Sequence, residues 1–215
     1  MILFILFASS CRKDEYETFK GSNDISYYNL KLGSYVTYDV TEIVYDDFTN
    51  SIDTSVYEVK EYNESVYTDN LGRKGIKLDR YIKNKTTGLW DYLNSYYSVN
   101  GQNSIERVEE NKRMIKLSFP VTTDAVWNSN SLNMDNAINV FYGLIRKKYQ
   151  QDAFKFESVI SVESANVINS FRERSFREIY AKNIGLIFKY YVNIEKNGNI
   201  WRGIKLTYRL KDYAL

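Results

Sequence analysis

The sequence predicts a mainly β protein: a single antiparallel barrel, half-barrel or sandwich with one or two short helices. Apolar and polar residues alternate with a period of two over many short segments, and turn residues separate these segments at hairpin spacing. The chain is also rich in strand formers, with 20 Tyr and 11 Phe among its 215 residues. We count roughly eight to ten candidate strands. A chain of this length can bury a sizeable core as one domain.

The alternation is clearest near the C-terminus. There, apolar positions 204, 206, 208 and 210 alternate with Lys205, Thr207, Arg209 and Lys211. The same pattern predicts strands at residues 36–40, 76–82, 90–99, 115–119, 154–162 and 185–194. Such segments have one buried and one solvated face, which favours antiparallel pairing over a parallel α/β fold.

Asn-Gly pairs occur at two predicted turns, Asn100-Gly101 and Asn197-Gly198. A type I′ hairpin needs positive φ at both central residues, and Asn and Gly adopt it most easily. We therefore expect the last two strands, 185–194 and 201–210, to pair antiparallel across Asn197-Gly198.

Evidence for helices is confined to two segments. In residues 136–149 the side chains of Ile138, Phe141, Tyr142 and Ile145 share one helical face, and three basic residues end the segment. This pattern predicts a helix, although Gly143 weakens it. Residues 164–174 fit either a second short helix or an irregular continuation of a strand.

The composition excludes several kinds of site. The chain has no His and a single Cys, so a Ser-His-Asp triad, a Cys-His pair and a histidine zinc site are all ruled out. The net charge of +2 is far from that of a nucleic-acid-binding domain. We expect no cofactor and no metal, and the chain shows no catalytic constellation. An enzyme would have to rely on a cleft lined by carboxylates.

The N-terminus predicts export and lipidation. Residues 1–8 form an apolar run, too short to span a membrane but of the length of a signal h-region. Cys11 is directly preceded by the small residues Ala8, Ser9 and Ser10, and this segment resembles the lipobox of bacterial lipoproteins. The resemblance implies a signal peptide at 1–10, a lipidated Cys11 that anchors the chain in a membrane, a tether through residue 24 and one domain at 25–215.

The residues after Cys11 bear on location. Arg12, Lys13, Asp14 and Glu15 resemble the export signal of Bacteroidetes lipoproteins that reach the outer face of the outer membrane. The same charges also suit a solvated tether. We expect an outer-membrane lipoprotein, on the periplasmic or the cell-surface side.

Several segments of the domain resemble a group of uncharacterised Bacteroidetes outer-membrane lipoproteins. These segments are residues 28–40, 67–73, 116–121 with the following Trp127 and Asn128, and 180–187. The resemblance implies a β-rich lipoprotein and supplies no activity or catalytic residues. By fold analogy alone, the pattern is also similar to open β-barrels that carry acyl chains.

The leading functional hypothesis is a non-enzymatic, membrane-anchored domain that binds or carries an apolar or extended ligand on a curved sheet. The alternative is a surface glycan-binding accessory protein, in which aromatic rings stack on sugars. The candidate stacking residues are Trp90, Tyr96, Tyr97, Trp127 and Trp201, with Tyr92 beside them. The ligand is thus expected to be a lipid or a glycan, and not a nucleic acid.

Two polar segments have simpler interpretations. Arg172, Arg174 and Arg177 lie among Phe171 and Phe176 but are interrupted by acidic residues, so we interpret them as a charged strand edge. The Asn-rich segment 128–136 lacks the acidic spacing of a calcium loop, and we interpret it as a plain loop.

Overall fold

A computed structural model describes residues 23–215 of the chain. Cys11 and the predicted signal peptide therefore lie outside the described residues. The elements are η1 (Asn23–Tyr27), β1 (Tyr35–Asp46), β2 (Ser51–Thr68), β3 (Lys74–Lys83), β4 (Trp90–Asn100), β5 (Ser104–Glu109), β6 (Lys112–Ser118), β7 (Val126–Asn128), β8 (Asn139–Gln151), β9 (Phe154–Ser164), β10 (Val167–Asn169), β11 (Arg172–Ala181), β12 (Gly185–Asn197) and β13 (Ile200–Ala214). The predicted mainly β class is confirmed.

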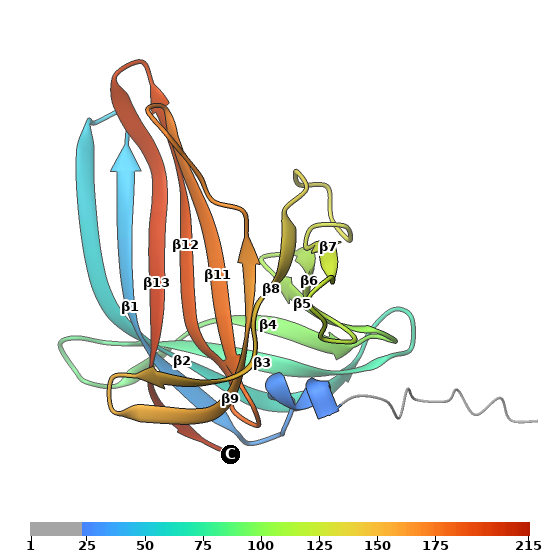
Figure 1. Cartoon of the computed structure of the whole chain (residues 1–215). Coiled ribbons are helices and arrows are strands. Elements are labelled where there is room, and N and C mark those ends of the chain that lie inside the picture. Colours follow the sequence, from blue (N-terminus) through green and yellow to red (C-terminus); the bar gives the residue numbers. More distant parts are fainter. Residues whose placement is uncertain (1–22) are drawn as a thin grey trace, which may run out of the picture.

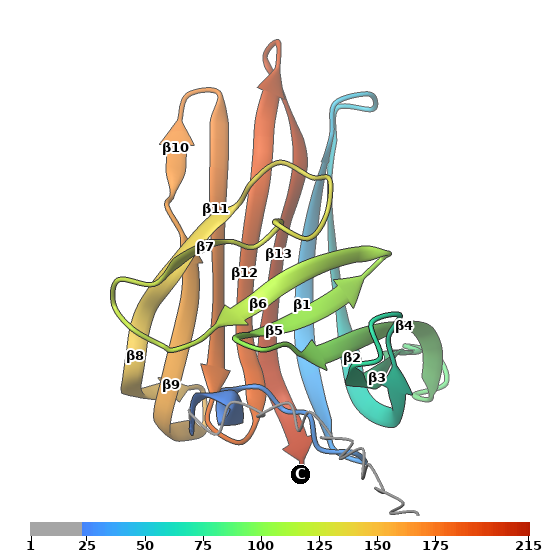
Figure 2. The same cartoon turned by 90° about the vertical axis from the view of Figure 1, so that its right-hand side faces the viewer.

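The strands form one antiparallel sheet that almost closes into a barrel. Its order is β6-β5-β4-β3-β2-β1-β13-β12-β11-β9-β8-β7, with β10 paired to β11. The two ends of this path meet at Ile115 of β6, whose N–H donates to the Ser129 carbonyl just after β7 at 2.9 Å. The carbonyl of Ile115 in turn accepts a hydrogen bond from the Trp127 indole N–H at 3.2 Å. Figures 1 and 2 show β5 and β6 folded back across the long strands.

The last hairpin forms as predicted, but its turn differs in type. β12 pairs antiparallel with β13, and Asn197 lies opposite Ile200. The central residues are therefore Gly198 and Asn199, of which only Gly198 has positive φ, at 64°. Glycine at the first central position is the signature of a II′ turn rather than the expected I′ turn. Asn100-Gly101 also departs from I′, because β4 and β5 are joined by a longer loop.

The helix predicted at 136–149 is wrong, since most of that segment is strand β8. The pairing of β8 with β9 shifts register between Tyr142 and Ile145 and again between Ile145 and Lys147. Arg146, at the second shift, has positive φ. These bulges insert extra residues into the alternation, so the inward residues are spaced like a helical face. Residues 164–174 form no helix either, but β10 and the start of β11.

Within the described residues the only helix is η1, a short 3-10 turn that begins before the expected domain start at residue 25. Asp24 is buried there and forms an ion pair with Arg146 at 2.6 Å. It also accepts the Val121 N–H at 3.3 Å. These contacts fix η1 to the sheet.

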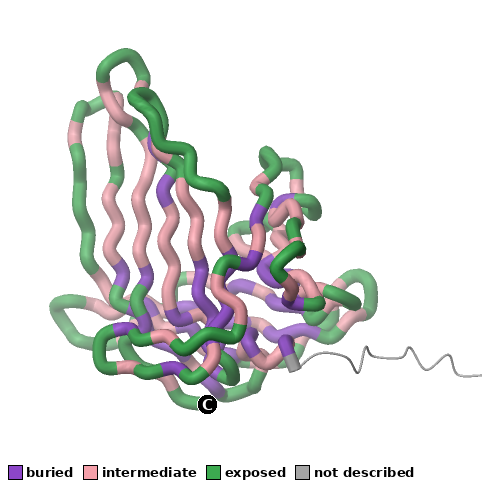
Figure 3. The backbone as a smooth tube through the Cα atoms, viewed as in Figure 1, coloured by how far each residue is buried: buried purple, intermediate pink, exposed green. Residues whose placement is uncertain are grey.

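The buried residues gather in the lower half of the molecule, as Figure 3 shows. One apolar cluster centres on Tyr38, Val40 and Ile179, and a second on Ile105, Leu117 and Tyr142. Above them β1, β2 and β11 to β13 continue as an extension in which most residues are half-buried or exposed and Val192 and Ile194 are buried. We call this extension the upper sheet, residues 41–57, 172–177 and 189–207.

Candidate functional site

Charged side chains fill the interior of the lower barrel. The charged residues that meet there come from β2, β3, β5, β6 and β11 and are each at most 8% exposed: Glu61, Arg80, Arg107, Lys116 and Glu178. Charged residues are rarely buried to this degree unless they are paired. The hollow lined by Tyr28, Glu61 and Arg107 has a volume of only about 30 Å³, which is room for about one water. The interior therefore holds no apolar cavity of acyl-chain size at this point.

These charges are paired across the barrel. Arg107 and Arg80 contact the same oxygen of Glu61, at 2.8 and 3.2 Å. The Arg107 Nε also lies 3.2 Å from Glu109. Lys116 of β6 contacts Glu178 of β11 at 2.6 Å. Two of the pairs, Arg107–Glu61 and Lys116–Glu178, connect strands that are not neighbours in the sheet, so they fix its curvature.

Tyrosine hydroxyls complete the network. Arg80 donates to the hydroxyls of Tyr96 and Tyr208, at 2.8 and 3.0 Å. The guanidinium carbons of Arg80 and Arg107 lie 4.5 and 4.9 Å from the Tyr96 ring centroid. Tyr180 donates to Glu178. Tyr96 is thus buried between two cations instead of presenting its ring to solvent.

The surroundings determine which of Glu61, Glu109 and Tyr96 carry a charge at neutral pH. Burial opposes ionisation of Glu61, but Arg107 and Arg80 outweigh it and keep the pKa of Glu61 below its usual value. Burial also opposes ionisation of Glu109, and Lys116 and Lys189 likewise lower the pKa of that carboxyl. Burial raises the pKa of Tyr96 to about 12. At neutral pH the two carboxyls are therefore ionised and Tyr96 is neutral.

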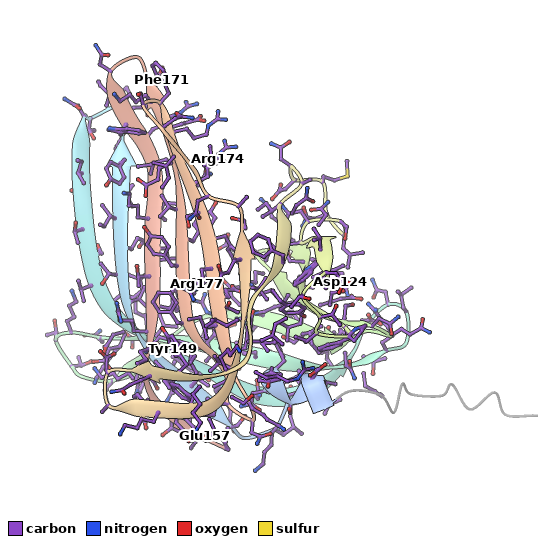
Figure 4. All side chains as sticks on the ribbon, in the orientation of Figure 1. Asp124, Tyr149, Glu157, Phe171, Arg174 and Arg177 are labelled. Carbon is purple, nitrogen blue, oxygen red and sulfur yellow. The ribbon has the colours of Figure 1, made fainter. Side chains whose placement is uncertain are left out.

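Above the barrel, an open trough runs along the inner face of the upper sheet. One hollow of about 570 Å³ lies between the β7–β8 loop (residues 129–138), β11 and β12. A second hollow of about 530 Å³ continues toward the hairpin ends of β1, β12 and β13. The two hollows share Arg174 and Asn193, so they form one elongated groove. Figure 4 shows Arg174 on the side of β11 that faces the β7–β8 loop.

Three guanidinium groups converge on one carboxylate, and two of them, those of Arg174 and Arg202, line the trough. Glu195 of β12 is contacted by Arg202 at 2.7 Å, Arg172 at 3.1 Å and Arg174 at 3.6 Å. Hydrogen bonds from Arg202 and Arg172 lower the pKa of Glu195. Asp46 and Asp47 line the same hollow, so this end of the trough mixes arginines with carboxylates.

The other end of the trough is apolar and aromatic. Phe176 and Tyr191 come from adjacent strands, and Ile138 faces them from the β7–β8 loop. The Phe176 ring lies 5.8 Å from the Lys116 ammonium of the interior network. The trough therefore offers an apolar segment at one end and a segment of mixed charge, with exposed arginines, at the other.

The aromatic residues proposed from the sequence do not converge on one surface. Trp90 lies at the start of β4, whereas Trp201 lies near the turn between β12 and β13. The Trp127 ring packs 4.9 Å from Tyr142 in the second apolar cluster. Tyr97 packs edge-on against Tyr67 at 5.0 Å.

The charged strand edge divides between the two faces of the sheet. Arg172 and Arg174 point toward Glu195, whereas Arg177 pairs with Glu163 at 3.1 Å. Sequence reasoning missed Glu195 and Arg202. The sequence could have indicated this pair, because a hairpin centred on Gly198 places Glu195 and Arg202 directly opposite each other.

The Asn-rich segment holds itself together. The Asn128 side-chain oxygen accepts the N–H groups of Asn130 and Ile138, both at 3.0 Å. Asn133 donates to the Arg113 carbonyl at 2.8 Å. These side chains shape the loop that walls the trough. Among residues 23–215, no group of three or more potential metal-ligating side chains is found, and no helix is long and apolar enough to cross a membrane.

No protein-family model and no curated protein matches the chain. Two solved structures are similar in fold. One is described as an exported protein with a YMCC-like fold, from Bacteroides fragilis (TM-score 0.44, 11% identity, 86% of this chain and 98% of that one). The other is described as a lipoprotein from Parabacteroides distasonis (TM-score 0.46, 9% identity, 87% and 98%). Both come from Bacteroidetes, and at this level of similarity no residue role is carried over.

Proposed function

We propose that the chain is an exported, lipid-anchored binding domain that holds an extended amphipathic anion in the trough. The observation that carries this proposal is that Arg174 and Arg202, which both contact Glu195, line a groove whose other end is apolar. The proposal narrows the apolar or extended ligand expected from the sequence to one that also bears an anionic group.

The dimensions of the trough support an elongated ligand. Each hollow has a volume within the usual range of small-molecule sites. A ligand that spans both would place its apolar part on Phe176 and Tyr191 and its anionic part beside Arg202. Charge-assisted hydrogen bonds to an arginine contribute about 1.5–3 kcal/mol each. Ordered apolar contacts contribute about 25 cal/mol per Å² buried.

We also propose that the domain is not an enzyme. The buried carboxylates Glu61 and Glu178 and the half-buried Glu109 are each paired with cations. A general acid needs a carboxyl that keeps its proton near neutral pH, and the low pKa values of Glu61 and Glu109 oppose that role.

The proposed location is the outer membrane, on its periplasmic or cell-surface side. The apolar run at 1–8 and the small residues before Cys11 support it. Two or three acyl chains on Cys11 would give stable anchoring, which a single chain does not.

Calorimetric titration with three matched probes tests the ligand class. Decyl phosphate supplies both a tail and a charge, decyl maltoside a tail alone, and inorganic phosphate a charge alone, each used below any micelle concentration. We expect saturable one-to-one binding of decyl phosphate and much weaker binding of the other two. Equal binding of decyl maltoside would show that the arginines play no part, and equal binding of inorganic phosphate would show that the apolar end plays none.

A further inference from the structure

The outer face of β1 to β4 carries a lysine surrounded by aromatic rings. Lys60 follows the inward-facing Val59 and precedes the inward-facing Glu61, so its side chain points away from the barrel interior. Its ammonium lies 4.8 Å from the Trp90 ring centroid, 5.5 Å from that of Tyr81 and 5.9 Å from that of Tyr35.

Within the described part of the chain, the Lys60 ammonium has no carboxylate within 4.0 Å, and its contacts are the three rings. Its neighbours differ in this respect. Lys83 pairs with Glu58 at 3.2 Å, and Lys211 pairs with Glu58 at 2.9 Å. The Lys60 ammonium can therefore pair with an anionic ligand that lies beside the Trp90 indole.

These residues line a hollow on the outer surface. Its volume is about 500 Å³, and Lys60, Trp90, Glu58 and Asp212 all line it. A second hollow of about 310 Å³ adjoins it, because both are lined by Glu58 and Lys83. Asn84 and Lys85 line the second hollow. The surface is thus an elongated groove with one aromatic wall and alternating cationic and anionic side chains.

We propose that this groove binds an acidic glycan, a chain of sugars that bear carboxylates. The half-buried Trp90 ring supplies a flat apolar surface on which the C–H face of a sugar stacks. The unpaired Lys60, and Lys85 further along, attract the sugar carboxylates. The Glu58 and Asp212 carboxylates accept hydrogen bonds from sugar hydroxyls.

The mixture of charges favours this occupant over other anions. A nucleic acid or a polyglutamate presents one negative charge after another, and Glu58 and Asp212 would repel such a dense array. A glycan spaces its carboxylates among hydroxyls, which matches cations separated by carboxylates. The groove lies on the opposite face of the sheet from the trough, so the two sites are tested independently.

Tryptophan fluorescence and calorimetry on the full chain test the proposal with a galacturonic acid hexamer as the probe. Galactose oligomers of similar length lack the charge, and hexaglutamate lacks the sugar rings. The test variants are Trp90→Ala and Lys60→Gln. Trp201→Ala and Lys196→Gln are the matched controls, because Lys196 lies 5.2 Å from the Trp201 ring in a similar pair outside both hollows.

We expect the galacturonic acid hexamer to bind the wild-type chain and each control variant equally well. Trp90→Ala and Lys60→Gln should each weaken that binding about tenfold or more, the scale of one lost stacking or charged contact. Circular dichroism of each variant verifies that the fold is intact. Lack of binding to the wild-type chain, binding that Trp90→Ala leaves unchanged, or equal binding of hexaglutamate would overturn the proposal.

Discussion

Lys116 and Glu178 form a buried ion pair at 2.6 Å that joins β6 to β11 across the barrel interior. These strands do not pair in the sheet, so the contact links two walls that backbone hydrogen bonds leave separate. The pair also marks the boundary between the filled interior and the open trough, because Lys116 lies against Phe176. The trough therefore has a fixed floor.

Removing one partner of this pair should destabilise the fold strongly. Glu178→Gln leaves the Lys116 ammonium buried without its closest carboxylate, which costs about 3–5 kcal/mol. The double variant Lys116→Met with Glu178→Leu should recover part of that loss, because neither partner of the pair is then left buried without the other. Urea unfolding measures both. Lys148→Gln, which breaks the exposed pair with Glu157, is the control and should change nothing measurable.

Stability should fall in acid and remain level through neutral pH. The pKa of Glu61 is lower in the folded chain than its usual value of 4.5, and the pKa of Glu109 is lowered in the same direction. Their stabilising contribution is therefore fully present above the unfolded pKa and is lost as pH falls below about 4.5 toward the folded pKa.

At alkaline pH, stability should fall as the pH rises, because a buried tyrosine must then ionise. Burial raises the pKa of Tyr96 from 10.0 to about 12, so its contribution persists below pH 10 and is lost as pH rises from there toward 12. Unfolding free energies measured from pH 3 to 11 check both limbs. A stability maximum near pH 4, or a steady rise above pH 10, would contradict the described network.

Gly203 should be intolerant of any side chain. It lies in β13 with φ of +122°, and an added Cβ would lie 2.1 Å from the Asn193 carbonyl oxygen in the adjacent strand β12. Gly203→Ala should cost about 1–3 kcal/mol, because both strain and a backbone clash oppose it. Gly198 also has positive φ, but an added Cβ would meet open space there. Gly198→Ala should therefore lower the free energy of unfolding by about 1 kcal/mol. Thermal unfolding of the two variants compares them, and equal losses would argue against the close approach at Gly203.

Lipidation of Cys11 should decide where the chain resides. Cys11→Ser removes the thiol that the lipobox resemblance assigns to the lipid, so the variant should stay unprocessed or leave the membrane fraction. Mass spectrometry of the N-terminal peptide and membrane fractionation measure this. Unchanged processing and partition would refute the anchor.

The parts of the fold that depend on local pattern were predictable from sequence. The β12–β13 hairpin is an example, because alternation and Gly198 specify it within one short segment, although the turn is centred one residue later than expected. β8 was misread because bulges near Ile145 and Arg146 break the alternation, and their position depends on the partner strand β9.

The interior network and the trough could not be read from the sequence. Glu61 and Arg107 are 46 residues apart, and Lys116 and Glu178 are 62 apart. Their meeting depends on how the whole sheet closes. In the trough, Arg172 and Arg174 were visible as a basic patch, but the common partner Glu195 lies on the neighbouring strand.

The affinity of decyl phosphate for Arg202→Gln, measured against that for the wild-type chain, tests the central claim most directly. Arg202 makes the shortest contact with Glu195, and its side chain is half exposed to the trough, so the substitution leaves the barrel interior untouched. We predict binding that is weaker by about tenfold or more, as expected for the loss of one charge-assisted hydrogen bond, with Lys148→Gln unchanged. Equal affinity of wild-type and Arg202→Gln chains would contradict binding of an anion in the trough.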